Sequence, residues 1–155
     1  MTLRLMSNKT LPFFKFITMY SSTISYRNSQ FDEAVFRRLT GLRPPDFEAF
    51  HDPFRKAWDD YFENFTLEGK VRYRKFSTRK NSVFPDTKEA LFFALVYLKG
   101  NIRQEELAAQ FGIDQPKTSK YLFLIRNLLV QTIKTNQKIL PKTKLERIRQ
   151  SVAVR

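Results

Sequence analysis

The sequence predicts an all-α fold, a small multi-helix bundle that contains a helix-turn-helix and carries a flexible basic N-terminal arm and a C-terminal extension. Three observations support this prediction. The chain of 155 residues is long enough for one domain with a hydrophobic core. Apolar residues recur at helical spacing from Phe31 onward. The stretch QEELAAQFGIDQPKTSKYL, residues 104–122, is typical of two short helices around a tight turn.

The first two segments differ in pattern. Residues 1–30 contain no acidic residue, many Ser, Thr and Asn, and no sustained period, so we expect a flexible basic arm. Residues 31–68 are expected to form N-terminal helices. In the first of these, Phe31, Val35, Phe36 and Leu39 lie on one stripe, and Gly41 is placed to end the helix.

Prolines punctuate the rest of the N-terminal helices. Pro44 and Pro45 restart the chain, and Asp52 with Pro53 are expected to cap and open a further helix, with His51 at a helix end. That helix carries an aromatic face expected to pack in the core: Phe54, Trp58, Tyr61, Phe62 and Phe65. The acidic residues Asp59, Asp60 and Glu63 are expected to form a solvated face, because adjacent helical residues point about 100° apart and cannot converge on one metal ion.

Residues 69–85 are interpreted as a basic linker strip. Six basic residues lie in GKVRYRKFSTRKN, namely Lys70, Arg72, Arg74, Lys75, Arg79 and Lys80. A neutral linker would connect the flanking helices equally well, so this charge favours contact with DNA phosphates or insertion in the minor groove. A merely soluble loop is the alternative.

Residues 86–137 are predicted to form the helix-turn-helix core. Asp86 and Glu89 fit a capping box, Gly100 fits a left-handed C-terminal residue, and ALFFALVYL between them is apolar on all sides. This helix is therefore expected to be buried, and to be the scaffold for the two helices of the motif.

Within the motif, each position has an expected role. Ala108 is the small residue where the helices touch, Gly112 makes the left-handed turn, and Ile113 enters the core. Asp114 caps the second helix, on which Thr118 and Tyr121 face inward. Outward-facing residues near its N-terminus are Gln115, Pro116, Lys117, Ser119 and Lys120. Leu122, Ile125, Leu129 and Ile133 continue an apolar stripe, which must pack on the aromatic helix or on a second subunit.

Charge and composition limit the function classes. The net charge of +13 is concentrated in residues 66–80, with +5, and in residues 115–155, with +9. This distribution is typical of a DNA-binding surface. There is no cysteine and a single histidine, so we expect no metal site, no catalytic residues and no cofactor. No apolar run approaches the ~20 residues that span a bilayer, so no membrane partner is expected.

Several segments together resemble a known family. FRRLTGL (36–42), GKVRYRK (69–75), LFFALVYLKGN (91–101), residues 104–122 and the long helix that follows resemble the N-terminal region of insertion-sequence transposases of the IS-five type. Arg103 stands where a Thr N-cap is usual in that family. In this family a helix-turn-helix precedes an RNase-H-like DDE nuclease domain. The matching DNA-binding positions are Gln115, Lys117, Thr118, Ser119 and Lys120.

The resemblance implies sequence-specific binding of double-stranded DNA at terminal inverted repeats. The family's metal-binding Asp, Asp and Glu lie beyond residue 155, so we expect a first reading frame or truncated copy that does not cut DNA alone. Residues 138–155 would then be a basic C-terminal linker, with a short helix after Pro141, toward an absent catalytic domain. We expect a cytoplasmic, nucleoid-associated protein whose other partner is a second copy or a separately encoded catalytic subunit. The alternatives are a stand-alone transcriptional regulator and a non-catalytic interaction subunit.

Overall fold

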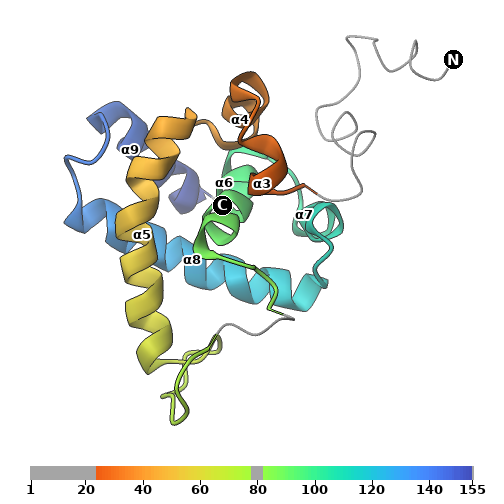
Figure 1. Ribbon diagram of the computed structural model, residues 1–155, viewed down its shortest axis with the longest axis vertical. Coiled ribbons are helices and arrows are strands. Elements are labelled where there is room, and N and C mark those ends of the chain that lie inside the picture. The colour runs from red at the N-terminus through yellow and green to blue at the C-terminus, as the bar shows by residue number, and fades with distance from the viewer. Residues whose placement is uncertain (1–23, 78–81, 155) are drawn as a thin grey trace, which may run out of the picture.

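One central helix organises the molecule. The computed structural model describes residues 24–77 and 82–154, and the helices in these ranges are α3 (Tyr26–Ser29), α4 (Glu33–Thr40), α5 (Pro44–Asn64), α6 (Thr87–Gly100), α7 (Gln104–Phe111), α8 (Gln115–Thr135) and α9 (Lys142–Val154). The other six all contact α6, which lies at the centre of Figure 1. The predicted all-α class is confirmed, and the described residues contain no strand.

Helix α6 is buried because its sequence is apolar all round. Every residue from Ala90 to Leu98 is buried, and the Asp86 side chain caps the helix by accepting the Glu89 N–H at 3.0 Å. Two details of the prediction are wrong. Asn101, with φ 53°, is the left-handed residue, and Gly100 remains helical. The buried Glu89 carboxylate, expected to complete a capping box, instead accepts the backbone N–H groups of Tyr26 at 2.9 Å and Arg27 at 3.0 Å.

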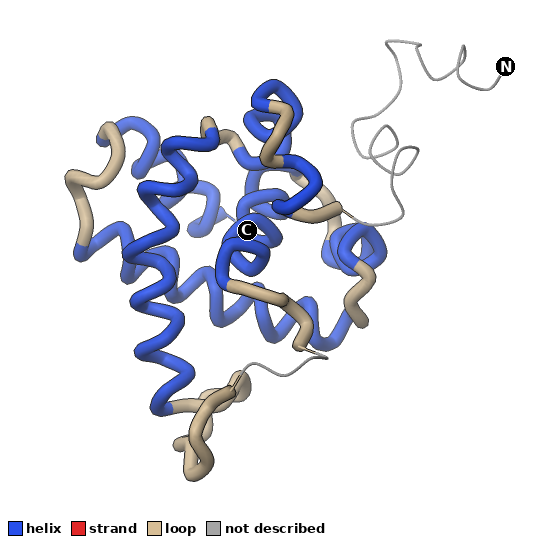
Figure 2. Tube along the Cα trace, viewed as in Figure 1, coloured by secondary structure: helices blue, strands red, loops and turns tan. Residues whose placement is uncertain are grey.

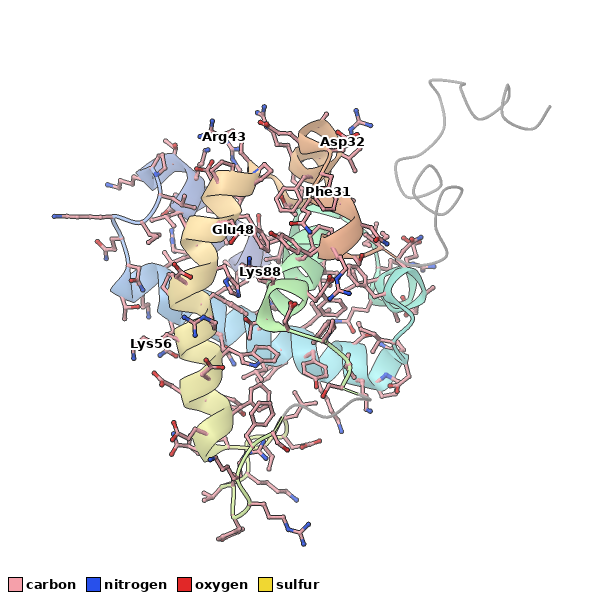
Figure 3. The ribbon with its side chains drawn as sticks, in the orientation of Figure 1. Phe31, Asp32, Arg43, Glu48, Lys56 and Lys88 are labelled. Carbon is pink, nitrogen blue, oxygen red and sulfur yellow. The ribbon has the colours of Figure 1, made fainter. Side chains whose placement is uncertain are left out.

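These bonds correct the prediction of a flexible arm over residues 1–30. Residues 24–30 belong to the fold: Ile24 and Tyr26 are buried, and the Tyr26 ring stacks on Phe47 with centroids 4.9 Å apart. The Tyr26 hydroxyl donates to Glu48 of α5, which also pairs with Lys88 of α6 at 2.9 Å. Figure 3 labels Glu48 and Lys88 on these two neighbouring helices. Burial and then Glu48 raise the pKa of the Tyr26 hydroxyl, which therefore stays a donor. Residues 1–23 lie outside the described residues.

Helix α4 follows its predicted pattern except at its start. Phe36 and Leu39 are buried, and Gly41, with φ 79°, ends the helix as expected. Asp32 is the N-cap, so Phe31 precedes the helix. The Phe31 side chain is 85% exposed instead of lying on the apolar stripe.

Helix α5 is one continuous helix, so the predicted break at Asp52 and Pro53 is wrong. An interior proline costs about 3 kcal/mol. Phe47, Phe50 and Phe54 are each fully buried, and each such burial contributes about 1.5–3 kcal/mol, which outweighs that cost. The expected aromatic packing is confirmed in α5, although Phe65 just after it is 39% exposed. His51 is buried within this helix instead of lying at its end, and its Nε2 is 2.7 Å from the Thr87 hydroxyl.

The short helix expected after Pro141 is present as α9, but it spans most of residues 138–155, which were predicted to be mainly a linker. Leu145, Ile148 and Val152 are buried against the core, and the Arg126 guanidinium of α8 donates to the Val152 carbonyl at 2.8 Å. Lys144 forms an ion pair with Asp46 of α5. The described residues therefore share one hydrophobic core and do not divide at the predicted segment boundaries.

Candidate nucleic-acid interface

The turn between α7 and α8 has the local chemistry that the sequence predicts. Gly112 adopts φ 67°, a left-handed conformation that glycine adopts more readily than any residue with a Cβ atom. Its N–H bonds to the carbonyls of Ala108 and Ala109, and the Ile113 N–H bonds to the Ala108 carbonyl at 3.0 Å. Ala108 is buried and Ile113 packs half-buried against the core. Gly112 therefore makes the left-handed turn, with Ala108 buried before it and Ile113 packed against the core after it.

Helix α8 is fixed in place at both ends. The Asp114 carboxylate accepts the Lys117 N–H at 2.8 Å, and Pro116 occupies the first turn, where a missing N–H costs nothing. The Tyr121 ring stacks on Trp58 of α5 with centroids 6.3 Å apart. The buried stripe from Leu122 to Ile133 packs within the monomer on α5, α6 and α9. The first of the two expected packing partners, the aromatic helix, is therefore the one observed.

The first two turns of α8 present a polar face. Gln115, Pro116, Lys117, Ser119 and Lys120 are all exposed, as predicted. Thr118 is completely buried. Its short side chain cannot reach a base edge, so its assignment as a DNA-contacting residue is incompatible with the structure. Thr118 packs the helix that carries the exposed residues.

The chain after α5 lies beside this face. The Lys120 ammonium is 3.5 Å from the Glu68 carboxylate, and an open groove is lined by Glu68 and Gly69 on one side and by Ser119, Lys120 and Phe123 on the other. Burial and then the Glu68 charge raise the pKa values of Tyr61, which lines this groove, and of Tyr121, so both stay neutral phenols. The segment around Glu68 therefore extends the exposed surface of α8.

The predicted linker strip begins as an ordered turn, which Figure 2 shows as the loop below α5. Phe65 and Val71 form an antiparallel bridge, the Thr66 N–H bonds to the Lys70 carbonyl at 2.8 Å, and the Tyr61 hydroxyl donates to the Thr66 carbonyl at 2.9 Å. These bonds hold the two ends of a short loop together, so the start of the strip has a defined structure.

The basic residues of the strip have different surroundings. The Arg72 guanidinium donates to the Phe65 carbonyl at 3.1 and 3.2 Å and lies 5.1 Å from the centre of the Phe76 ring. It therefore holds the turn together. Lys70, Arg74 and Lys75 are exposed. Arg79 and Lys80, which were also predicted to contact DNA, lie outside the described residues.

Comparison with known proteins matches the segment that carries this geometry. Residues 86–135 match the family model described as the helix-turn-helix of DDE superfamily endonuclease. The match covers α6, α7 and α8, about a third of the chain. No curated protein and no solved structure matches the chain. The helix-turn-helix predicted from residues 104–122 is therefore supported by its backbone geometry and by this similarity, which points to DNA binding.

The described residues show little that would hold a metal ion. No group of three or more His, Asp or Glu side chains is arranged for one in residues 24–77 and 82–154. Asp59 and Asp60 instead pair with Arg55 at 3.7 Å and Lys56 at 3.2 Å, as a solvated helix face. None of the described helices is long and apolar enough to cross a membrane.

Two residues near the interface were not singled out from the sequence. Glu68 faces Lys120 although 52 positions separate them, and no local pattern predicts that contact. Tyr73 is 95% exposed at the tip of the strip. Its position between Arg72 and Arg74 was a readable signal, because an aromatic residue among basic residues is common in nucleic-acid-binding loops.

Proposed function

We propose that this protein binds double-stranded DNA sequence-specifically through the N-terminal turns of α8, as the DNA-binding part of an insertion-sequence transposase that recognises terminal inverted repeats. The observation that carries the proposal is the capped, exposed face of α8. Gln115, Lys117, Ser119 and Lys120 project from a helix whose position is set by the Gly112 turn. The N-terminal residues of a recognition helix are those that meet base edges in the major groove.

The exposed side chains suit two kinds of contact. The Gln115 amide suits paired hydrogen bonds to adenine, and Lys117 or Lys120 suits a guanine edge, each good pair contributing about 1–3 kcal/mol of discrimination. Lys70, Arg74 and Lys75 lie on the neighbouring strip and would contact phosphates. If these three and the two lysines of α8 each neutralise one phosphate, log K falls with log salt at a slope of about −4.5. Affinity would then drop about 500-fold between 50 and 200 mM salt.

A salt titration of binding to a duplex tests this function. We expect Lys117→Ala to weaken binding, and a loss confined to one sequence indicates a base contact. An equal loss on all sequences, with the slope reduced by about 1, indicates a phosphate contact. Lys134→Ala is a matched control, because Lys134 is exposed on the same helix about 25 Å away. The absence of duplex binding at low salt would refute the proposal.

The target separates a transposase component from a transcriptional regulator, because both would use the same face of α8. We expect the duplex sequence selected by the protein to occur as an inverted pair flanking the gene, next to an encoded DDE nuclease. A selected sequence that occurs in a promoter without such a pair would support the regulator.

A further inference from the structure

The tip of the basic strip presents an aromatic ring to solvent. Tyr73 is 95% exposed and Val71 is 60% exposed, although both are large apolar side chains. Around them lie the exposed basic residues Lys70, Arg74 and Lys75, and residues 69–77 contain no acidic residue. An exposed aromatic ring in a cationic setting suits a ligand that is both planar and negatively charged.

The ring is carried on a supported loop. The Phe76 ring stacks on Phe62 of α5 with centroids 5.2 Å apart. The Arg72 guanidinium lies over the same Phe76 ring and also donates to the Phe65 carbonyl. Tyr73 lies between Arg72 and Phe76, two residues that are both attached to the fold. Its ring is therefore presented from a pre-organised turn, which lowers the entropy cost of stacking on a ligand.

We propose that the turn of residues 65–77 binds unpaired nucleotides of DNA, with a base stacked on the Tyr73 ring and the adjacent phosphates neutralised by Lys70, Arg74 and Lys75. This is a second binding activity, beyond duplex recognition by α8. It combines the two elements that single-strand binders use, a basic surface along the backbone and an aromatic platform for bases.

Unpaired bases fit this loop better than an intact duplex does. In a duplex both faces of each base are covered by stacking, and exposing one costs a few kcal/mol. An unpaired base has its face available, and stacking is tolerant of sequence because every base has a π face. A protein partner would have to place acidic groups around the ring to match the basic residues, which makes it the less direct ligand for this surface.

The position of the loop gives the unpaired nucleotide a place relative to the duplex. Glu68, on the same turn, pairs with Lys120 of α8 across the groove at 3.5 Å. Nucleotides held by Tyr73 would therefore lie at the edge of a duplex held by α8. The structure favours a DNA substrate that is paired over the helix-turn-helix and open beside it.

Fluorescence anisotropy with the full chain and a labelled 15-nucleotide oligo(dT) tests the proposal. We expect Tyr73→Ala to weaken oligo(dT) binding by about 5- to 150-fold, the range of one lost stacking contact. Tyr73→Phe keeps the ring and is expected to bind within about 2-fold of the wild type. Because the side chain is 95% exposed, neither substitution removes packing that the fold needs. Equal affinity of the wild type and Tyr73→Ala, or no binding of oligo(dT), would overturn the proposal.

Two further arms separate this activity from others. A Gln115→Ala, Lys117→Ala double variant, which leaves the Glu68–Lys120 pair in place, is expected to keep its oligo(dT) affinity within about 3-fold, so failure of duplex recognition by α8 leaves this readout intact. If the double variant loses oligo(dT) binding as fully as duplex binding, the strip has no binding activity of its own and the proposal is wrong. Oligo(U) of the same length is expected to bind no more tightly than oligo(dT). A tenfold preference for oligo(U) would overturn the assignment to DNA in favour of RNA.

Discussion

Glu89→Ala tests how the N-terminal helix is attached to the core. The Glu89 carboxylate accepts the backbone N–H groups of Tyr26 and Arg27 and is itself buried. Removing it leaves these two donors without their acceptor, and each buried donor left unsatisfied costs about 1–3 kcal/mol. Water can reach the donor at the exposed Arg27 more easily than the one at the buried Tyr26. We therefore expect the free energy of unfolding to fall by about 2–4 kcal/mol.

Urea unfolding followed by circular dichroism measures this loss. With a slope of about 2 kcal/mol per molar urea, the middle of the range for small proteins, the midpoint should fall by roughly 1–2 M. Glu105→Ala is the matched control, since Glu105 is an exposed acidic residue in the first turn of α7, and it should change stability by less than about 0.5 kcal/mol. Glu89→Gln keeps one oxygen acceptor, so its loss of stability should lie between those of Glu89→Ala and Glu105→Ala. If Glu89→Ala were as stable as Glu105→Ala, the proposed attachment would be wrong.

Three other predictions address the core and the interface. Thr118→Val should leave the free energy of unfolding unchanged or raise it by up to about 1 kcal/mol, because the buried Thr118 hydroxyl has no hydrogen-bond partner among the described residues. Duplex affinity should not change. A loss of duplex affinity without a loss of stability would support the predicted DNA contact by Thr118. Burial, and then the Lys88 charge, lowers the pKa of His51, so below pH 6.5 the unfolded chain binds a proton that the folded chain resists. The free energy of unfolding, measured by urea titration, should therefore fall as the pH is lowered from 7 to 5.5. His51→Gln should remove most of that fall, since the chain has no other histidine. An unchanged fall in the variant would refute the assignment of this pH dependence to His51. Ile148→Ala should lower the free energy of unfolding by about 2–4 kcal/mol, measured by thermal or urea unfolding, because Ile148 is buried. Replacing the exposed Arg149 with Ala should lower it by less than about 0.5 kcal/mol. Equally small losses for both variants would show that α9 does not pack on the core.

The features predicted correctly depend on local chemistry. A glycine at position 112 followed by Asp114 predicts a turn and a helix cap from nearest-neighbour sterics and hydrogen bonding alone. The apolar sequence of α6 predicts its burial without knowledge of its neighbours. These two signals place the exposed face of α8 correctly.

The wrong predictions arise where tertiary packing outweighs a local signal. Pro53 is a strong local breaker, but the helix continues because the aromatic residues before and after it are buried on the same side. In α9, Leu145, Ile148 and Val152 are spaced three and four residues apart, yet the surrounding basic residues favoured a linker. Their burial depends on the surface that α6 and α8 present, and this surface cannot be derived from the segment itself.

Contacts at the interface were the least predictable part. The pairing of Glu68 with Lys120 and the placement of the basic strip beside α8 depend on how α5 crosses α8. Residue types predicted which side chains are basic and exposed. They did not predict that Arg72 is committed to the turn while Arg74 and Lys75 remain exposed.

Selection of binding sites from a randomised duplex library tests whether the exposed face of α8 reads base sequence. The purified chain, at about 0.15 M salt, should enrich one sequence motif. Gln115→Ala and Lys117→Ala should each relax the preference at a different base pair of that motif, because each removes one side chain from the exposed face of α8. Enrichment of no sequence over the input, or the same motif with undiminished preference from both variants, would contradict base reading by this helix.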